Sequence, residues 1–310
     1  MKRIEDVNVL VIGDIMLDEY IIGNVERISP EAPVPIVNII ERTYSLGGCG
    51  NVVDNIIKMG ANATCVCTIG DDAVGSKISK LLNDTVEDFA LARINGIKST
   101  HKARIISDVR MMQMLRVDEE DTRSTLPFET NKKIEERLLD CLNSIDFKKF
   151  DMILISDYAK LTICKAVMNW VYGTCIKVIV DPKPVNAYLY KDIFAITPNY
   201  HEYNKMIFSE HMLASNLQYI ITTLGGDGLQ IHDMGDDSVK HIDTESVEVY
   251  NVSGAGDTII AALGICIPMG IDIVQSCRIA NDCARKVVQS FETSAVSKDE
   301  FKDIIATHLD

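Results

Sequence analysis

The stretch V-N-V-L-V-I-G, residues 7–13, decides the fold class of this 310-residue chain. Five of its first six residues are aliphatic, and the run stops at Gly13. A short apolar run that ends at a glycine is typical of a strand buried on both faces of a parallel sheet. Similar runs alternate with helical patterns along most of the chain. This alternation predicts a doubly wound α/β fold, with helices on both sides of a mostly parallel sheet.

The other expected elements follow in chain order. Strands are predicted at 63–69, 152–155, 177–180 and 219–222, and helices at 51–59, 73–82, 131–142, 163–172, 254–267, 271–291 and 299–307. Two segments, 19–42 and 99–118, break the alternation, because each holds two short strand-like runs around a loop or hairpin turn. We expect these four strands to form a small lid over one edge of the sheet. No long linker is present, so residues 1–310 are expected to form a single domain.

Composition and charge exclude several classes of function. The net charge of −14 argues against a nucleic-acid partner, because phosphate backbones attract basic surfaces. No run reaches the ~18 apolar residues that a membrane span needs, so no membrane partner is expected. Acidic residues near the N-terminus and a short apolar run do not fit a secretory leader. We therefore expect a cytoplasmic protein that acts on small molecules.

Nine cysteines are spread along the chain, and none forms a C-x-x-C pair. Most lie inside apolar runs, which is typical of buried thiols in a reducing compartment. Because no paired Cys/His spacing exists, a zinc site is not expected from the sequence.

The first motif with chemical meaning is G-A-G-D, residues 254–257, which opens an apolar helix. Small residues at a helix start expose backbone N–H groups, and these groups together with the helix dipole favour an anion such as phosphate. An acid beside that anion is placed to accept a proton from an attacking hydroxyl during phosphoryl transfer. The simpler interpretation is an ordinary helix start with a favourable acid in its first turn.

Four other loops follow predicted strands, and each has a simpler alternative. G-G-C-G-N at 47–51 offers an open backbone and an amide to a sugar, or is only a flexible loop. Asn199 and Glu202 present oxygens to a hydrated Mg²⁺, or form an N-terminal capping box. T-L-G-G-D-G at 223–228 is a phosphate-binding turn or a tight turn between strands. The fourth loop, V-D-P-K-P at 180–184, is another strand end that carries an acid and a base. Together they lie at the sheet edge where α/β proteins bind ligands.

These motifs resemble the two signatures of the ribokinase-like carbohydrate kinases, the PfkB family, over nearly the whole chain. Within that family, five further stretches resemble the kinases that act on D-glycero-β-D-manno-heptose 7-phosphate: G-D-I-M-L-D (13–18), R-I-S-P-E-A-P-V-P (27–35), S-D-Y-A-K (156–160), D-P-K (181–183) and T-P-N (197–199). The resemblance implies a ribokinase-like fold, ATP and Mg²⁺ as cofactors, and transfer of phosphate to the anomeric hydroxyl. The product would be a heptose 1,7-bisphosphate, a precursor in lipopolysaccharide biosynthesis.

The resemblance also assigns roles to residues. Asp257 matches the catalytic base, and Gly254, Ala255 and Gly256 match the anion hole. The nucleotide segment matches Asn199, Tyr200, His201 and Glu202, with Mg²⁺ held by Asn199 and Glu202 through water. The turn under the ATP phosphates matches Thr223, Gly225 and Gly228. Sugar-binding positions match Asp14, Gly47, Gly48 and Asn51. By family analogy the lid would also pair two subunits into a homodimer.

The substrate's own phosphate requires cations. Lys102 and Arg104 are two residues apart on one expected strand and would share a face, and Lys160 is a third candidate. The alternative for each is solvated surface charge.

Some positions depart from the family pattern. Cys49 and Val53 stand where the front signature usually has a small residue. The chain ends at Asp310 without an H-x-G-H motif, so a stand-alone kinase without a nucleotidyltransferase domain is expected. Three alternatives remain open: another sugar or sugar-phosphate kinase of the ribose or fructose type, an inactive sugar-phosphate sensor, and a structural interaction module.

Overall fold

The computed structural model describes residues 2–109, 111–207, 216–290 and 294–309. In this part of the chain the main sheet has nine strands in the order β13-β12-β11-β10-β9-β8-β1-β4-β5. Their bounds are β1 Asn8–Gly13, β4 Asn62–Gly70, β5 Asp88–Ile94, β8 Met152–Ser156, β9 Val178–Asp181, β10 Ala195–Ile196, β11 Tyr219–Thr223, β12 Leu229–Asp233 and β13 Ser238–Ile242. The run from β11 to β5 is parallel, and β12 and β13 add antiparallel edge strands.

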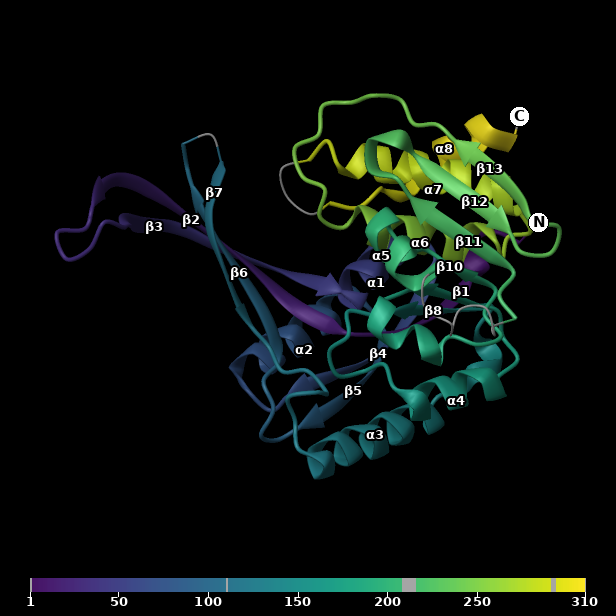
Figure 1. Cartoon of the computed structure of the whole chain (residues 1–310), viewed down its shortest axis with the longest axis horizontal. Helices are drawn as coiled ribbons and strands as arrows, with labels where there is room; N and C mark the ends of the chain where they lie inside the picture. The colour runs from purple at the N-terminus through teal and green to yellow at the C-terminus, as the bar shows by residue number, and fades with distance from the viewer. Residues whose placement is uncertain (1, 110, 208–215, 291–293, 310) are drawn as a thin grey trace.

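The central strand β1 shows why both faces of the sheet are apolar. Val9 and Val11 point into one hydrophobic cluster, whereas Leu10 and Ile12 point into another. Side chains alternate along a strand, so a continuous apolar run serves two cores at once. The predicted α/β fold, with helices covering both sides of a mostly parallel sheet, is confirmed (Figure 1).

The helices divide between these two cores. One core is shared by α1 (Cys49–Lys58), α2 (Ala73–Thr85), α6 (Ala255–Cys266), α7 (Ile273–Val287) and α8 (Lys298–Leu309). The other is covered by α3 (Phe128–Asn143), α4 (Lys165–Gly173) and α5 (Tyr200–Ile207). Of these, α6 is buried along nearly its whole length, because it lies between the sheet and α7.

Four strands form a separate sheet in the order β3-β2-β6-β7, as the broken alternation predicted. Their bounds are β2 Ile15–Ile28, β3 Pro35–Gly48, β6 Thr100–Ser107 and β7 Met112–Glu119. This second sheet extends away from the main body in Figure 1. Its strands β2 and β3 are longer than the expected short runs, because they pair as one hairpin through the proline-rich loop. Arg110, between β6 and β7, lies outside the described residues.

Several boundaries and strands differ from the prediction. The helix expected at 271–291 covers only Ile273–Val287, and Phe291 lies outside the described residues. Strands β5 and β13 were not predicted, and β10 and β12 were only implied, as the strand before Asn199 and the strand after the turn at 223–228. Of these, β10 has two residues and is too short for periodicity to reveal, and β5 and β13 are edge strands with mixed burial.

A membrane-spanning helix would need a long apolar segment. None of the helices within the described ranges is both long enough and apolar enough to cross a bilayer.

Candidate active site

The predicted site loops converge where the parallel strands end. Strand β1 ends at Gly13 and β8 at Ser156, and these two residues are partners in the register. The N-termini of α1 and α6 lie at the same edge, because Asn51 of α1 contacts Asp257 of α6. Two motifs that are 206 residues apart in sequence are thus joined by one hydrogen bond.

Asp257 is the buried carboxylate at this edge. Helix α6 begins after Gly254, whose φ of 87° lies in the left-handed region that glycine adopts without strain. Asp257 is only 5% exposed, and its Oδ2 accepts from Asn51 Nδ2 at 2.8 Å. Its Oδ1 accepts from the Tyr158 hydroxyl at 3.0 Å. Burial raises the pKa of Asp257 to about 6, although these two hydrogen bonds partly offset the rise.

Asp14 holds the loop that carries Tyr158. Its Oδ2 accepts from the backbone N–H groups of Tyr158 and Lys160 at 2.9 and 3.0 Å. Its Oδ1 accepts from those of Leu161 and Thr162 at 3.0 and 2.8 Å. The side chain expected to contact the sugar therefore has both oxygens engaged by the protein's own backbone. What the geometry supports for Asp14 is the positioning of Tyr158.

Gly47 and Gly48 remove side chains where other atoms must lie. A Cβ on Gly47 would collide with the Asp18 carboxylate, and one on Gly48 would collide with the Asp14 carbonyl oxygen. Gly48 also has a φ of 60°, which a side chain would strain. These glycines let the start of α1 lie against β2.

Asp18 and Tyr158 are site residues that the sequence reasoning did not single out. Asp18 is buried. The main cause of the raised pKa of Asp257 is its own burial, and the negative charge of Asp18 adds to the rise. Asp18 pairs with Arg104 across the β2–β6 register. Asp18 lies in the motif stretch 13–18 and Tyr158 in the stretch 156–160. Their roles depend on a strand pairing and a loop conformation that spacing alone does not give.

Asn199 and Glu202 form a reciprocal capping box at the start of α5. The Glu202 N–H donates to Asn199 Oδ1 and the Asn199 N–H donates to Glu202 Oε2, both at 3.0 Å. Lys183 of the D-P-K stretch forms an ion pair with Glu202. The N-terminal capping box, which was the simpler alternative for these two residues, is thus present in the structure. The Glu202 carboxylate also lies beside the Lys183 ammonium group. Tyr200 and His201, which follow in α5, are exposed.

The turn at 223–228 joins β11 to β12, as its simpler interpretation predicted. Gly225 and Gly228 have φ values of 63° and 83°. A Cβ on Gly225 would meet no described atom within 4 Å, and the same holds for Gly256 in α6. Both backbones are therefore open on one side. Thr223 bridges to Asn199, which brings this turn next to the start of α5.

The three candidate cations differ in their partners. Arg104 is paired with Asp18, and Lys160 Nζ lies 2.6 Å from Glu120. For Lys102 no ion pair occurs within the described ranges, and its Nζ lies 5.6 Å from the centre of the Tyr158 ring. Burial lowers the pKa of Lys102. Lys102 is thus the cation among the three that has no carboxylate partner in the described structure.

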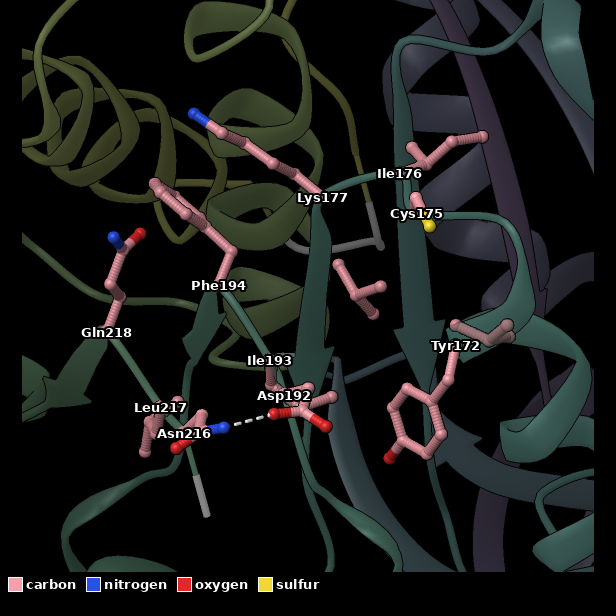
Figure 2. A pocket seen from close by; sticks show the side chains of 12 residues that line it. Tyr172, Cys175, Ile176, Lys177, Asp192, Ile193, Phe194, Asn216, Leu217 and Gln218 are labelled. Atoms are coloured by element: carbon pink, nitrogen blue, oxygen red, sulfur yellow. Dashed lines mark hydrogen bonds between the residues drawn. The ribbon is translucent and has the colours of Figure 1, made fainter.

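A cavity of about 630 Å³ lies at the opposite end of the strands (Figure 2). It is lined by residues before β9, β10 and β11, and the Asn216 amide donates to Asp192 at its rim. None of the predicted site residues lines it. Since the carboxyl ends of the strands carry the glycine loops and Asp257, we place the candidate site there.

Comparison with known proteins identifies the family of this chain. Residues 6–300 match the pfkB family of carbohydrate kinases. The chain belongs to this family. It is 36% identical to the Bifunctional protein HldE of Sulfurimonas denitrificans, over 96% of this chain and 64% of the relative. The HldE of Campylobacter jejuni serotype O:6 is 34% identical over 95% of this chain, and again 64% of the relative is covered. The chain thus spans just under two thirds of the length of these relatives.

Solved structures show the same fold. Phosphofructokinase-2 from Escherichia coli in complex with substrates and products has a TM-score of 0.75 and 16% identity, over 98% of this chain and all of that one. The same enzyme in complex with fructose-6-phosphate has a TM-score of 0.74 and 17% identity, over 98% and 99% of the two chains. The PfkB chain is therefore ribokinase-like in fold and a phosphotransferase of the carbohydrate kinase type. Sugar kinases of this family bind a sugar or sugar phosphate and use ATP with a divalent metal ion.

We predict that Asp14→Asn will destabilise the fold. An amide has one acceptor oxygen in place of two, so two buried N–H groups of the 158–162 loop lose their partner. Each orphaned group costs about 1–3 kcal/mol. Urea unfolding should show this loss, whereas Asp6→Asn, in an exposed ion pair with Arg3, should change stability by about 1 kcal/mol or less. An Asp14→Asn protein as stable as the parent would contradict the positioning role.

Proposed function

We propose that this chain phosphorylates the anomeric hydroxyl of D-glycero-β-D-manno-heptose 7-phosphate with ATP, giving the 1,7-bisphosphate. The observation that carries the proposal is the buried carboxylate of Asp257, held by Asn51 and Tyr158 beside the open backbone at the start of α6. The heptose assignment rests on the five motif stretches and on the similarity to the two HldE relatives.

Asp257 is proposed as the general base. A pKa of about 6 leaves it mostly ionised at neutral pH yet basic enough to accept a proton from the sugar hydroxyl. Asn51 and Tyr158 both donate to it, so both carboxylate oxygens have fixed positions. Fixing the acceptor before the substrate arrives lowers the entropic part of the barrier.

The anion hole is proposed at Gly254, Ala255 and Gly256, at the N-terminus of α6, where a Cβ on Gly256 would meet no described atom within 4 Å. The turn containing Thr223, Gly225 and Gly228 would bind the ATP phosphates, with Asn199, Tyr200, His201 and Glu202 of the neighbouring segment along the nucleotide. The support for phosphate binding in this turn is Gly225, where a Cβ would meet no described atom within 4 Å.

The donor set near α5 fits a hydrated Mg²⁺. Asn199 and Glu202 carry an amide and a carboxylate oxygen, which are the ligand types that Mg²⁺ prefers. These oxygens are already engaged by the capping box and by Lys183, so the contact to the ion would run through its retained waters. A bound Mg²⁺ supplies neutralisation of charge on the nucleotide's phosphates. Lys183, already paired with Glu202, places a second positive charge at this end of the site.

The sugar phosphate is proposed to lie between the second sheet and Tyr158. Gly47, Gly48, Asn51 and Asp18 line its sugar end, and Asp14 acts there by holding the 158–162 loop. Lys102 is the first choice for the 7-phosphate, because it is half-buried and forms no ion pair among the described residues, although the charges of Asp18 and Asp118 act on it. Arg104 and Lys160 would contribute if their ion pairs rearrange. The second sheet, at about 19–42 and 99–118, acts as a lid that excludes water.

Another sugar or sugar-phosphate kinase activity is the second candidate. The fold matches phosphofructokinase-2, one structure of which contains fructose-6-phosphate. A catalytically inactive sugar-phosphate-binding protein is less well supported, because Asp257 is present, buried and hydrogen-bonded.

Asp257→Asn should lower kcat by at least ~10²-fold, because the amide cannot accept the proton. The measurement is ADP release from ATP with saturating sugar phosphate. Nucleotide binding, measured by calorimetry, should persist, which separates lost chemistry from lost folding. A near-normal turnover in this variant would eliminate Asp257 as the base.

A substrate panel tests the choice of sugar. Heptose 7-phosphate should give a kcat/KM at least ~100-fold above those of fructose 6-phosphate, ribose and fructose, since a site built around polar groups discriminates strongly. The control is ATP hydrolysis without sugar. A preference for another sugar would overturn the heptose assignment and leave the kinase intact, whereas no transfer to any sugar would favour the inactive binding protein.

Tyr158→Phe should move the acidic limb of the pH profile of kcat/KM upward. The hydroxyl stabilises the ionised form of Asp257, so removing it raises the pKa of that carboxyl above about 6. A shift of ~1 pH unit corresponds to the lower end of a charged hydrogen bond. Tyr172→Phe, whose hydroxyl donates to the Leu189 carbonyl instead, is the matched control. An unmoved limb would mean that Asp257 does not govern it.

We also propose that the second sheet pairs two subunits. Several large apolar side chains on it are more than half exposed: Ile28 62%, Ile39 51%, Ile40 64%, Met112 56% and Leu115 55%. Light scattering should give about twice the 34.4 kDa of one chain, and Leu115→Glu with Ile40→Glu should halve the mass. Val239→Glu on β13, 53% exposed, is the control. A monomeric parent protein would refute the pairing.

A further inference from the structure

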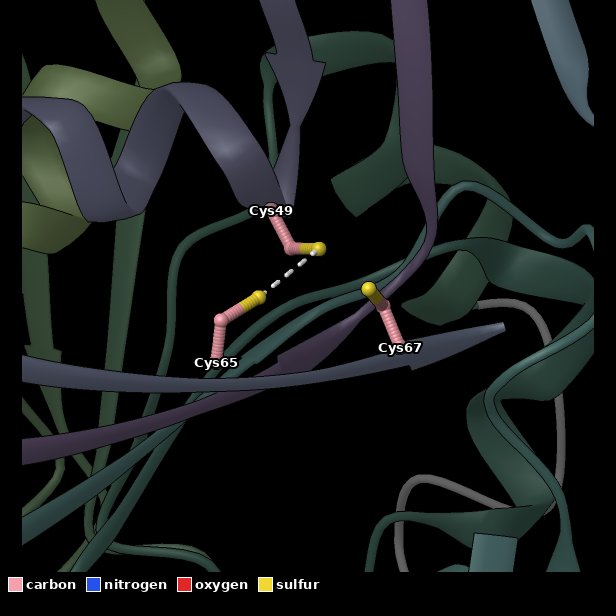
Figure 3. Close-up of side chains that lie close together, drawn as sticks. All are labelled: Cys49, Cys65 and Cys67. Carbon is pink, nitrogen blue, oxygen red and sulfur yellow. Dashed lines mark hydrogen bonds between the residues drawn. The ribbon is translucent and has the colours of Figure 1, made fainter. Parts of the chain in front are cut away.

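Three cysteine side chains meet beneath the start of α1 (Figure 3). Cys49 is the first residue of that helix, and Cys65 and Cys67 lie on β4. Residues two apart on a strand point to the same face, so both β4 thiols face α1. All three side chains are 0% exposed, and their sulfur atoms lie within 4.8 Å of one another. Cys49 Sγ and Cys65 Sγ are 4.0 Å apart.

We propose that Cys49, Cys65 and Cys67 form a structural binding site for a thiophilic divalent cation, with Zn²⁺ as the ion that fits best. Three sulfurs at about 2.3 Å from one metal ion are separated from each other by about 3.8–4.0 Å. The Cys49–Cys65 pair already has this separation. The longer pairs need to close by less than an ångström, which side-chain rotation supplies.

Electrostatics favour a divalent over a monovalent ion. Three thiolates around Zn²⁺ leave one net negative charge in the core, whereas Cu⁺ would leave two. The remaining charge lies at the first residue of a ten-residue helix, where the helix dipole stabilises an anion. Binding would release the protons of the thiols.

A buried polar atom without a partner lies across Gly13 from Cys49. Ser156 is fully buried, and its Oγ makes no hydrogen bond to any described residue. A Cβ built on Gly13 would lie 2.8 Å from Cys49 Cβ and 2.9 Å from Ser156 Cβ, so these two residues flank the space that Gly13 leaves open. A buried hydroxyl without a partner costs free energy.

Cysteine spacing does not reveal this site, because ligand spacing of the zinc-finger type is absent. Cys65 and Cys67 form a C-x-C pair on a strand, and Cys49 comes from a neighbouring helix. The nearest chemical alternative is a disulfide between Cys49 and Cys65, which would need an oxidant and would leave Cys67 free. The test therefore distinguishes metal binding from oxidation.

The experiment uses the full chain, refolded under reducing conditions with one equivalent of Zn²⁺ so that the buried site can load. After desalting, elemental analysis should find about one zinc per chain. The double variant Cys65→Ala with Cys67→Ala should lower the affinity for Zn²⁺ by at least ~10-fold. Loss of a residue that only supports a metal ligand already costs about this much, and this variant loses two ligands. Cys277→Ala with Cys283→Ala, which removes two buried thiols from α7, should retain the zinc.

X-ray absorption on the parent protein keeps the proposal testable if the cluster variant fails to fold. Zinc should show about three sulfur neighbours at about 2.3 Å. Zinc bound only through nitrogen and oxygen, zinc retained equally by the cluster variant, or no zinc retained after refolding would each overturn the proposal. A Cys49–Cys65 disulfide forming in the presence of zinc at the same rate as in its absence would do so too.

Discussion

The carboxylate of Asp14 is the constraint on which the site depends. It follows the central strand β1, and its two oxygens accept four backbone N–H groups of the 158–162 loop. Its own carbonyl oxygen accepts from the Cys49 N–H at 3.0 Å, at the start of α1. One residue therefore fixes both the loop that carries Tyr158 and the helix that carries Asn51. These are the two side chains that donate to Asp257, so Asp14 positions that carboxylate indirectly, through both donors.

Burial and hydrogen bonding act on Asp257 in opposite directions. Removal from water favours the protonated form, and the donors Asn51 and Tyr158 favour the ionised form. Without these donors the pKa would rise further, which favours the protonated form. Without burial it would be ionised but a weaker base. The raised pKa of about 6 is the balance between the two, and it depends on two hydrogen bonds from separate elements.

The sequence was informative where the chemistry is local. The apolar run of β1 and the glycines before Asp257 predicted a buried strand and a helix start at an anion site, because each depends on a few consecutive residues. Tyr158, Asp18 and Lys183 were not singled out. Their contacts depend on how separate segments meet: Tyr158 through the Asp14 loop, Asp18 through the β2–β6 register, and Lys183 through α5. Asp14 was identified from its motif, but its hydrogen bonds to the loop could not be read from spacing.

The cysteine cluster connects with the site through α1. Cys49 lies between Gly48 and Asn51, so it shares a single helical turn with the residue that donates to Asp257. A metal ion bound by Cys49, Cys65 and Cys67 would tie that turn to β4, in addition to the bond from Cys49 N–H to Asp14. Position 49 is the first residue of α1, and its backbone N–H donates to the Asp14 carbonyl. The Cys49 thiol at that position lies close to the thiols of Cys65 and Cys67. The proposed ion would therefore make the orientation of Asn51 less dependent on the single hydrogen bond from the Cys49 N–H to the Asp14 carbonyl.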